Sequence, residues 1–336
     1  MNSIDYRLLG RSGLKVSKLC FGSMTFGNNQ WGIGGVDERL AAEMIAACFD
    51  RGVNFFDTAD VYSDGESERL LGKALGARRG NAVIATKVRG RMSQGPNDVG
   101  LSRHHILESC DASLKRLGTD HIDLYQMHSF DFETPLEETL RALDDLVRMG
   151  KVRYIGVSNF AAWQLMKVLS LSDKMGLERF VSLQAYYSLA GRDLEAELVP
   201  LCLDQGLGIL TWSPLAGGFL SGKYRKGVPM PEGRLKGQLG DFIPVDKDRG
   251  HKIIEALEDI AKAKDVSVAA TALAWLAHKP GVASVIVGAR TMEQLQDNLK
   301  AAQILLRSEE MERLDNVSAV PLPYPQWMLA FTRADR

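Results

Sequence analysis

The chain alternates short apolar runs with longer amphipathic stretches, and this alternation restricts the fold more than any other feature of the sequence. Eight runs of strand length are each followed by a stretch with apolar residues at helical spacing, such as NAVIATK and then the segment 102–117. Strands that alternate with helices are expected to pair in parallel through right-handed crossovers. Eight such units predict an α/β fold, a closed (β/α)8 TIM barrel.

The expected elements have definable bounds. The strands are expected at residues 18–21, 53–57, 81–87, 122–128, 154–158, 181–185, 208–212 and 284–287, and the helices at 37–51, 67–75, 102–117, 136–149, 161–175, 194–205, 266–278 and 291–301. An N-terminal β-hairpin (6–9 and 14–16), an added helix (248–263) and an extra C-terminal helix and tail (305–336) exceed the minimal barrel. We treat residues 1–336 as a single barrel domain. An open doubly wound sheet is the alternative, but GSMTFG after the first strand lacks the G-x-G-x-x-G spacing.

Composition excludes several classes of protein. The 336 residues include 41 Lys+Arg and 42 Asp+Glu, so there is no basic excess that would indicate nucleic-acid binding. No run approaches the ~18 apolar residues of a membrane span, and the N-terminus has no apolar signal region. The cysteines form no CxxC pair, which argues against a metal site and fits reduced thiols in the cytoplasm: Cys20, Cys48, Cys110 and Cys202.

Ionisable side chains stand at or just after the ends of expected strands. Asp57 ends FFD, Tyr62 follows five residues later, Lys87 ends IATK, and His128 ends LYQMH. In a barrel these strand ends converge on one rim. Each residue alone is more often a solvated or satisfied polar group, but apolar strands that end in ionisable groups place them where burial can shift their pKa values.

Longer segments carry a resemblance to a known family. FFDTADVYSDGESERLLGKAL, VIATKV, DLYQMHSFD, VRYIGVSNF, SLQAYYSLAGR and LTWSPLAGGFLSGKY resemble the aldo-keto reductase superfamily, over nearly the whole chain. The branch of bacterial oxidoreductases and potassium-channel β subunits is the most similar. The resemblance implies a (β/α)8 barrel that reduces aldehydes and ketones with NAD(P)H, with Asp57, Tyr62, Lys87 and His128 as the catalytic tetrad.

The chemistry of carbonyl reduction is consistent with this tetrad. A Tyr phenol can donate the proton, but its ordinary pKa is about 10, and a neighbouring Lys ammonium favours the phenolate. We expect Asp57 to pair with Lys87, and His128 to orient the carbonyl oxygen by a hydrogen bond. A positioned acid of this kind is worth about 10²–10⁴-fold in rate.

The resemblance also implies cofactor contacts. Ser158, Asn159 and Gln184 would hold the nicotinamide carboxamide, and Trp212 would stack on the ring. Glycines after Trp212 allow close approach of the backbone to a pyrophosphate, and N–H groups at a helix start bind anions. The remaining expected contacts are Gly22, Ser23, Met24, Asp57, Ser213, Pro214, Leu215, Gly217, Gly218, Lys223, Arg225, Gly288, Arg290, Gln294 and Asn298.

Arg290 matches a 2′-phosphate because its fork fits phosphate geometry, so NADPH/NADP+ is expected over NADH. Many family members carry a Lys-Ser pair and a later Arg here, whereas this chain has Gly288-Ala289 and Gln294. Expected substrate-pocket residues are Met24, Trp31, Tyr62, His128 and Trp327, around a small-molecule carbonyl or alcohol substrate.

Two other functions remain open at this point. The barrel could bind NADPH tightly and act as a redox-sensing regulatory subunit with little turnover, although a complete tetrad favours chemistry. An aldolase or isomerase is the other, but a Schiff-base Lys87 would have to be neutral, which Asp57 opposes. The sequence does not decide whether the protein is a homo-oligomer.

Overall fold

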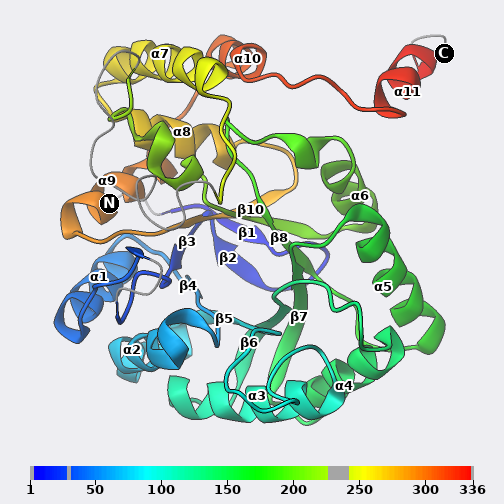
Figure 1. Ribbon diagram of the computed structural model, residues 1–336. Helices are drawn as coiled ribbons and strands as arrows, with labels where there is room; N and C mark the ends of the chain where they lie inside the picture. Colours follow the sequence, from blue (N-terminus) through cyan, green and yellow to red (C-terminus); the bar gives the residue numbers. More distant parts are fainter. Residues whose placement is uncertain (1–3, 29–31, 226–241, 334–336) are drawn as a thin grey trace.

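The computed structural model describes residues 4–28, 32–225 and 242–333, and its centre is a closed barrel of eight parallel strands (Figure 1). The order around the barrel follows the chain, with the last strand pairing with the first. This confirms the (β/α)8 prediction and rules out the open doubly wound sheet. The strands are β3 (Leu19–Gly22), β4 (Phe55–Asp57), β5 (Val83–Val88), β6 (Ile122–Met127), β7 (Val152–Ser158), β8 (Ser182–Tyr186), β9 (Gly208–Trp212) and β10 (Val282–Val287).

A hairpin of β1 (Tyr6–Leu8) and β2 (Lys15–Ser17) closes the amino-terminal end of the barrel. Leu9 and Val16 are fully buried there, in one cluster with barrel-interior residues such as Phe55 and Leu210. Because this end is covered, only the carboxyl ends of the strands can open onto a site. That is the end where (β/α)8 enzymes carry their chemistry.

Helices surround the barrel on all sides, and several begin at a residue whose side chain caps the first turn. Asp37, Ser102 and Ser267 each accept a backbone N–H of the first turn, which satisfies a donor that the helix leaves unpaired. The helices of the eight units are α1 (Glu38–Asp50), α2 (Glu66–Leu75), α3 (Arg103–Leu117), α4 (Leu136–Arg148), α5 (Ala162–Met175), α6 (Leu198–Gln205), α8 (Val268–Ala277) and α9 (Met292–Lys300). None of the described helices is both long enough and apolar enough to cross a membrane.

Helix α6 is shorter than expected. A single helix over 194–205 was the prediction, whereas a 3-10 turn at Asp193–Glu195 is followed by α6 from Leu198. Pro200 explains the later start, because a proline lacks the N–H that a helix interior needs and is tolerated in the first turn. Most other bounds agree within two residues.

Besides the hairpin, the described residues add three α-helices to the barrel: α7 (Lys247–Lys264), α10 (Ser308–Val317) and α11 (Gln326–Arg333). Ion pairs join α7 to α10, with Lys264 3.0 Å from Glu310 and Arg313 2.5 Å from Asp259. Figure 1 shows α11 at the end of an extended segment, outside the ring of helices. The tail therefore contains a helix of its own, which the sequence did not predict.

Candidate active site

The alternation of side chains along a strand explains which residues face the barrel interior near its open end. Phe55 and Ala85 belong to the interior cluster, so Asp57 and Lys87, two residues further along, face the same way. Leu124 is also interior, which turns Gln126 inward. Lys87 pairs in register with Gln126, and these polar groups meet above a floor of apolar side chains.

Asp57, Lys87 and Tyr62 form a hydrogen-bonded group. Nζ of Lys87 lies 2.6 Å from Oδ1 of Asp57, 2.7 Å from the carbonyl oxygen of Thr58 and 3.3 Å from the phenol oxygen of Tyr62. Lys87 is fully buried and Asp57 is 3% exposed. An ammonium buried to this extent needs such partners, since an unpaired buried charge is costly.

The charge of Lys87 is maintained by its partners. Burial disfavours the ammonium, but Asp57 and Tyr62 outweigh burial, so the pKa of Lys87 is raised above its ordinary value. The raised pKa favours the charged form of Lys87. A neutral lysine ready to form a Schiff base is incompatible with this arrangement.

Two glutamines complete the environment of Asp57. Nε2 of Gln184 donates to Oδ2 of Asp57 at 2.7 Å, and Nε2 of Gln126 donates to the same oxygen at 3.2 Å. The sequence predicts a cofactor contact for Gln184 and no role for Gln126. In the sequence, Gln126 looks like any other residue inside a strand. Only the alternation of side chains along the strand, which points Gln126 to the same side as Leu124, could have indicated that it faces the site.

His128 lies one residue beyond β6, beside Tyr62. The two ring centroids are 5.9 Å apart in an edge-to-face arrangement. Burial, together with the positive charges of Lys87 and Arg89, lowers the pKa of His128 to about 3. The imidazole is therefore neutral near pH 7 and can offer one N–H donor to an oxygen atom between the two rings.

Ser158 and Asn159 end β7, as expected. Asn159 has a left-handed backbone (φ 56°), in which its amide donates to the carbonyl oxygen of His128 and to Oγ of Ser158, both at 3.0 Å. The indole N–H of Trp212 donates to Oδ1 of Asn159 at 3.0 Å. These contacts bring the ends of β6, β7 and β9 together on one side of the Asp57 group.

The chain after Trp212 turns through several left-handed positions. Ser213 (φ 47°), Gly217 (φ 67°) and Gly218 (φ 94°) all have positive φ, with Pro214 and Leu215 between them. A Cβ at Gly218 would meet no atom within 4 Å, so the backbone there is open on that side. An exposed backbone of this kind allows close approach of a ligand.

At the start of α9, side chains of the same segment cap the free backbone groups, and the cations Arg290 and Lys223 lie close by. Thr291 accepts from the N–H of Gln294, Oε1 of Gln294 accepts from the N–H of Arg290, and Asn298 donates to the carbonyl oxygen of Gly288. Burial and the charge of Arg290 lower the pKa of Lys223. Arg290 and Lys223 thus repel each other, and neither forms an ion pair with a carboxylate in the described part of the chain. Such a pair is suited to an anion.

Some expected contact residues have other partners. Ser23 is fully buried, where its hydroxyl donates to the carbonyl oxygen of Asp57 and lies 2.8 Å from Oγ of Ser67. Gly22 packs closely against Ile286, because a Cβ added at position 22 would lie 2.7 Å from Cγ2 of Ile286. Met24 is partly buried in the following loop. Arg225 is bound to Glu258 of α7 at 2.8 Å.

Of the two tryptophans expected to line the substrate pocket, only Trp327 lies within the described residues. Trp327 is half exposed on α11, where it contacts the ring of Tyr324, and Figure 1 shows this helix away from the ring of barrel helices. Trp31 lies outside the described residues, as does most of the loop 223–245. The structure therefore places Trp327 in the tail, with its ring against that of Tyr324.

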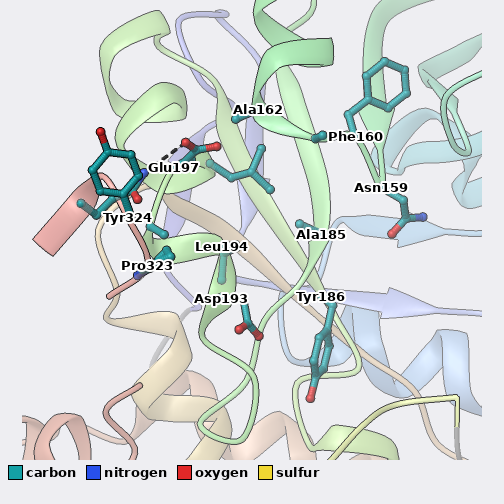
Figure 2. A pocket seen from close by; sticks show the side chains of 14 residues that line it. Asn159, Phe160, Ala162, Ala185, Tyr186, Asp193, Leu194, Glu197, Pro323 and Tyr324 are labelled. Carbon is teal, nitrogen blue, oxygen red and sulfur yellow. Dashed lines mark hydrogen bonds between the residues drawn. The ribbon is translucent and has the colours of Figure 1, made fainter. Parts of the chain in front are cut away.

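A groove of about 550 Å³ runs beside Asn159. Figure 2 shows Ala185, Tyr186 and Leu194 along it, with Pro323 and Tyr324 on the side away from Asn159. Glu197 accepts a 3.0 Å hydrogen bond from Gln326, which ties the tail to the start of α6. The segment before α11 thus forms one wall of a hollow next to the site.

Arg89, which the sequence analysis did not single out, follows β5. Its backbone is left-handed (φ 137°), and its Nε is buried without a hydrogen-bond partner among the described residues. From the sequence alone, a charged residue at a strand end is expected to be exposed to solvent. Only the structure shows that Arg89 differs from such a residue. No three His, Cys, Asp or Glu side chains of the described residues are placed to hold a metal ion.

Comparison with known proteins agrees with this geometry. The family model described as the aldo/keto reductase family matches residues 18–319. An oxidoreductase of Bacillus subtilis, YrpG, is 40% identical, with 95% of this chain and 97% of the relative covered. A versiconal hemiacetal acetate reductase of Aspergillus parasiticus is 37% identical (93% and 96% covered), and a probable voltage-gated potassium channel subunit beta of Arabidopsis thaliana is 40% identical (90% and 92% covered). The chain, an oxidoreductase-type (β/α)8 barrel, therefore belongs to the aldo/keto reductase family.

Proposed function

We propose that this protein reversibly reduces aldehydes or ketones to alcohols with NADPH, and that Tyr62 is the general acid. The observation that carries the proposal is that one buried ammonium, Lys87, contacts both Asp57 (2.6 Å) and the phenol of Tyr62 (3.3 Å). A carboxylate that fixes an ammonium beside a phenol is an arrangement for proton transfer.

The residues act on the two ends of the carbonyl bond. When bound, a nicotinamide cofactor supplies a hydride to the carbonyl carbon. Tyr62 donates a proton to the carbonyl oxygen, and the Lys87 ammonium stabilises the negative charge that remains on the phenol oxygen. In the oxidation direction the same phenol oxygen accepts the proton of the alcohol.

His128 orients the substrate. Its low pKa, about 3, keeps the imidazole neutral, so it donates a hydrogen bond without competing with Tyr62 as the proton source. In this proposal both groups bind the same carbonyl oxygen, and the edge-to-face arrangement keeps their rings side by side, with centroids 5.9 Å apart. A donor fixed in advance costs no reorganisation during the reaction.

The cofactor assignment rests on the residues that remain available to bind it. Gln184 uses its N–H on Asp57, which leaves its Oε1 to accept from a carboxamide. The open backbone at Gly218 suits a pyrophosphate, and Arg290 with Lys223 suits a 2′-phosphate. These features favour NADPH over NADH.

The test is NADPH oxidation, followed by absorbance, with a panel of aldehydes and ketones. We expect Tyr62→Phe to lower the turnover rate by at least about 10²-fold while NADPH binding, measured by fluorescence, changes little. Asp60→Asn is the control, because Asp60 lies beside the site and is not the proposed proton donor. It tests whether a local disturbance alone lowers the turnover rate. Full activity in Tyr62→Phe would exclude Tyr62 as the acid.

A second candidate follows from the plant relatives named as channel β subunits. The chain would then bind NADPH and respond to its oxidation as a regulatory subunit with little turnover. Tight NADPH binding without reduction of any panel compound would favour this function. The presence of the complete Asp57–Lys87–Tyr62 group favours the reductase.

A further inference from the structure

Arg89 lies between the two residues that face the carbonyl in the proposed reaction. The backbone N–H of His128 donates to the carbonyl oxygen of Val88 at 2.9 Å, which fixes the end of β5 beside His128. On the other side, a Cβ at Gly90 would lie 2.0 Å from Cγ1 of Val61, so this segment packs directly against the residue before Tyr62. Arg89 is the residue between these two contacts.

The conformation of Arg89 is unusual for a residue with a side chain. Its φ of 137° lies in a region that residues with a side chain disfavour. Strained residues of this kind concentrate where a side chain must be aimed at a ligand. The strain therefore points to a use for the guanidinium.

Among the described residues, the Arg89 guanidinium has no partner that accounts for its position. Its Nε is buried without a hydrogen bond, and within residues 4–28, 32–225 and 242–333 no carboxylate forms an ion pair with it. Asp131, in the next loop, is already bound by the N–H groups of Leu101 and Glu133 and by the hydroxyl of Thr134. The carboxylate of Asp57, which binds Lys87, is also engaged on both oxygens, by Lys87 and by Gln184.

A half-buried guanidinium without a counter-ion is suited to a carboxylate, which its fork binds in a bidentate manner. We propose that Arg89 binds an anionic group of the substrate, so that the preferred substrates are carbonyl compounds that carry a carboxylate near the carbonyl. This inference rests on the proposed function, because it names the substrate class of the same site. Arg89 would determine specificity rather than take part in proton transfer.

The test compares the three carboxybenzaldehyde isomers with their uncharged methyl esters as substrates. We expect at least one acid to be reduced with a higher kcat/KM than its ester, and Arg89→Met to lower this acid-to-ester ratio by roughly 10- to 100-fold. Arg89→Lys should retain part of the preference. Arg91→Met is the matched control, since Arg91 is exposed two residues away and donates to Ser93 and Gly95.

A binding measurement separates this inference from the proposed function. Benzoate titrated into the protein with NADP+ bound should bind more weakly to Arg89→Met than to wild type or Arg91→Met, by the same factor. Thermal melting checks that each variant is folded. If the esters are reduced but Arg89→Met leaves the acid-to-ester ratio of kcat/KM unchanged, the inference about Arg89 is wrong. The proposed reductase function would still be supported. No turnover of any compound would count against the reductase, and the benzoate titration would still decide the role of Arg89.

Discussion

Gln184 donates a hydrogen bond to Asp57 across the barrel, with Nε2 2.7 Å from Oδ2, although the two residues are 127 positions apart in the sequence. Lys87 holds the opposite oxygen, Oδ1, at 2.6 Å. The carboxylate of Asp57 is thus surrounded by donors on both sides. These donors fix the orientation of the carboxylate. Because the carboxylate binds Lys87, they also fix the position of the ammonium beside Tyr62.

Asp57→Asn should destabilise the fold as well as the site. An asparagine amide must turn its NH₂ either toward the Lys87 ammonium or toward the donating amides of Gln184 and Gln126, and both choices oppose donor to donor. Breaking a buried pair in this way costs about 3–5 kcal/mol in the free energy of unfolding, measured by urea denaturation. The comparison is Glu43→Gln, which removes an exposed pair with Arg39 and should cost less than about 1 kcal/mol. Equal effects of the two substitutions would show that the buried pair adds no stability.

His128 should not titrate between pH 5 and 8. Its pKa is lowered to about 3 by burial and by Lys87 and Arg89, so the folded protein keeps a neutral imidazole where an unfolded chain, with a histidine pKa near 6.5, takes up a proton. His128 should therefore contribute to a loss of stability as the pH falls from about 6.5 toward 3. NMR titration of the imidazole signals, with His128→Asn to assign its resonance, measures this directly. A midpoint near pH 6.5 for that resonance would contradict the expected burial.

The sequence predicted the barrel because its signals are local and repeated. Each strand and helix can be read within about a dozen residues, and once the fold is a barrel, strand-end residues such as Asp57 and Lys87 must meet. Gln126 and Arg89 were missed because their roles depend on neighbours distant in sequence. Gln126 faces Asp57 only through the pairing of three strands, and the strain of Arg89 is not visible in a residue name.

The C-terminal tail shows the same limit more strongly. The sequence predicts an extra C-terminal helix and a tail over residues 305–336, but not where the tail docks. The structure fixes it through Gln326, which binds Glu197 at 3.0 Å, and leaves Trp327 half exposed. A terminal helix has no register or crossover rule to restrict its position, so its docking has to be observed.

Asp60→Asn should make the stability of the protein less dependent on pH. Asp60 is fully buried, its Oδ1 accepts the N–H of Val61 at 2.7 Å, and its Oδ2 has no partner among the described residues. Burial and the nearby Glu68 carboxylate raise the pKa of Asp60 to about 8. The unfolded carboxyl loses its proton near pH 4, whereas the folded one keeps it until about pH 8, so stability falls as the pH rises between these values.

Asparagine resembles the protonated acid and avoids this loss. From pH 5 to pH 8, the unfolding free energy of the wild type should fall relative to that of Asp60→Asn by more than about 1.4 kcal/mol, the equivalent of one pKa unit. Urea denaturation at the two pH values gives the difference. Parallel curves for the two proteins would mean that Asp60 is already ionised at pH 5.

Arg290→Ala should distinguish the two nicotinamide cofactors. Arg290 and Lys223 lie close enough to repel each other, and an additional phosphate between them would relieve that repulsion. The 2′-phosphate is the group that NADPH has and NADH lacks, so removing one cation should weaken NADPH by roughly 10- to 100-fold and NADH by far less. Arg225→Ala is the control, because its guanidinium is bound to Glu258 at 2.8 Å and should matter little to either cofactor. Fluorescence titration gives both dissociation constants, and equal weakening of NADPH and NADH would move the phosphate contact away from Arg290.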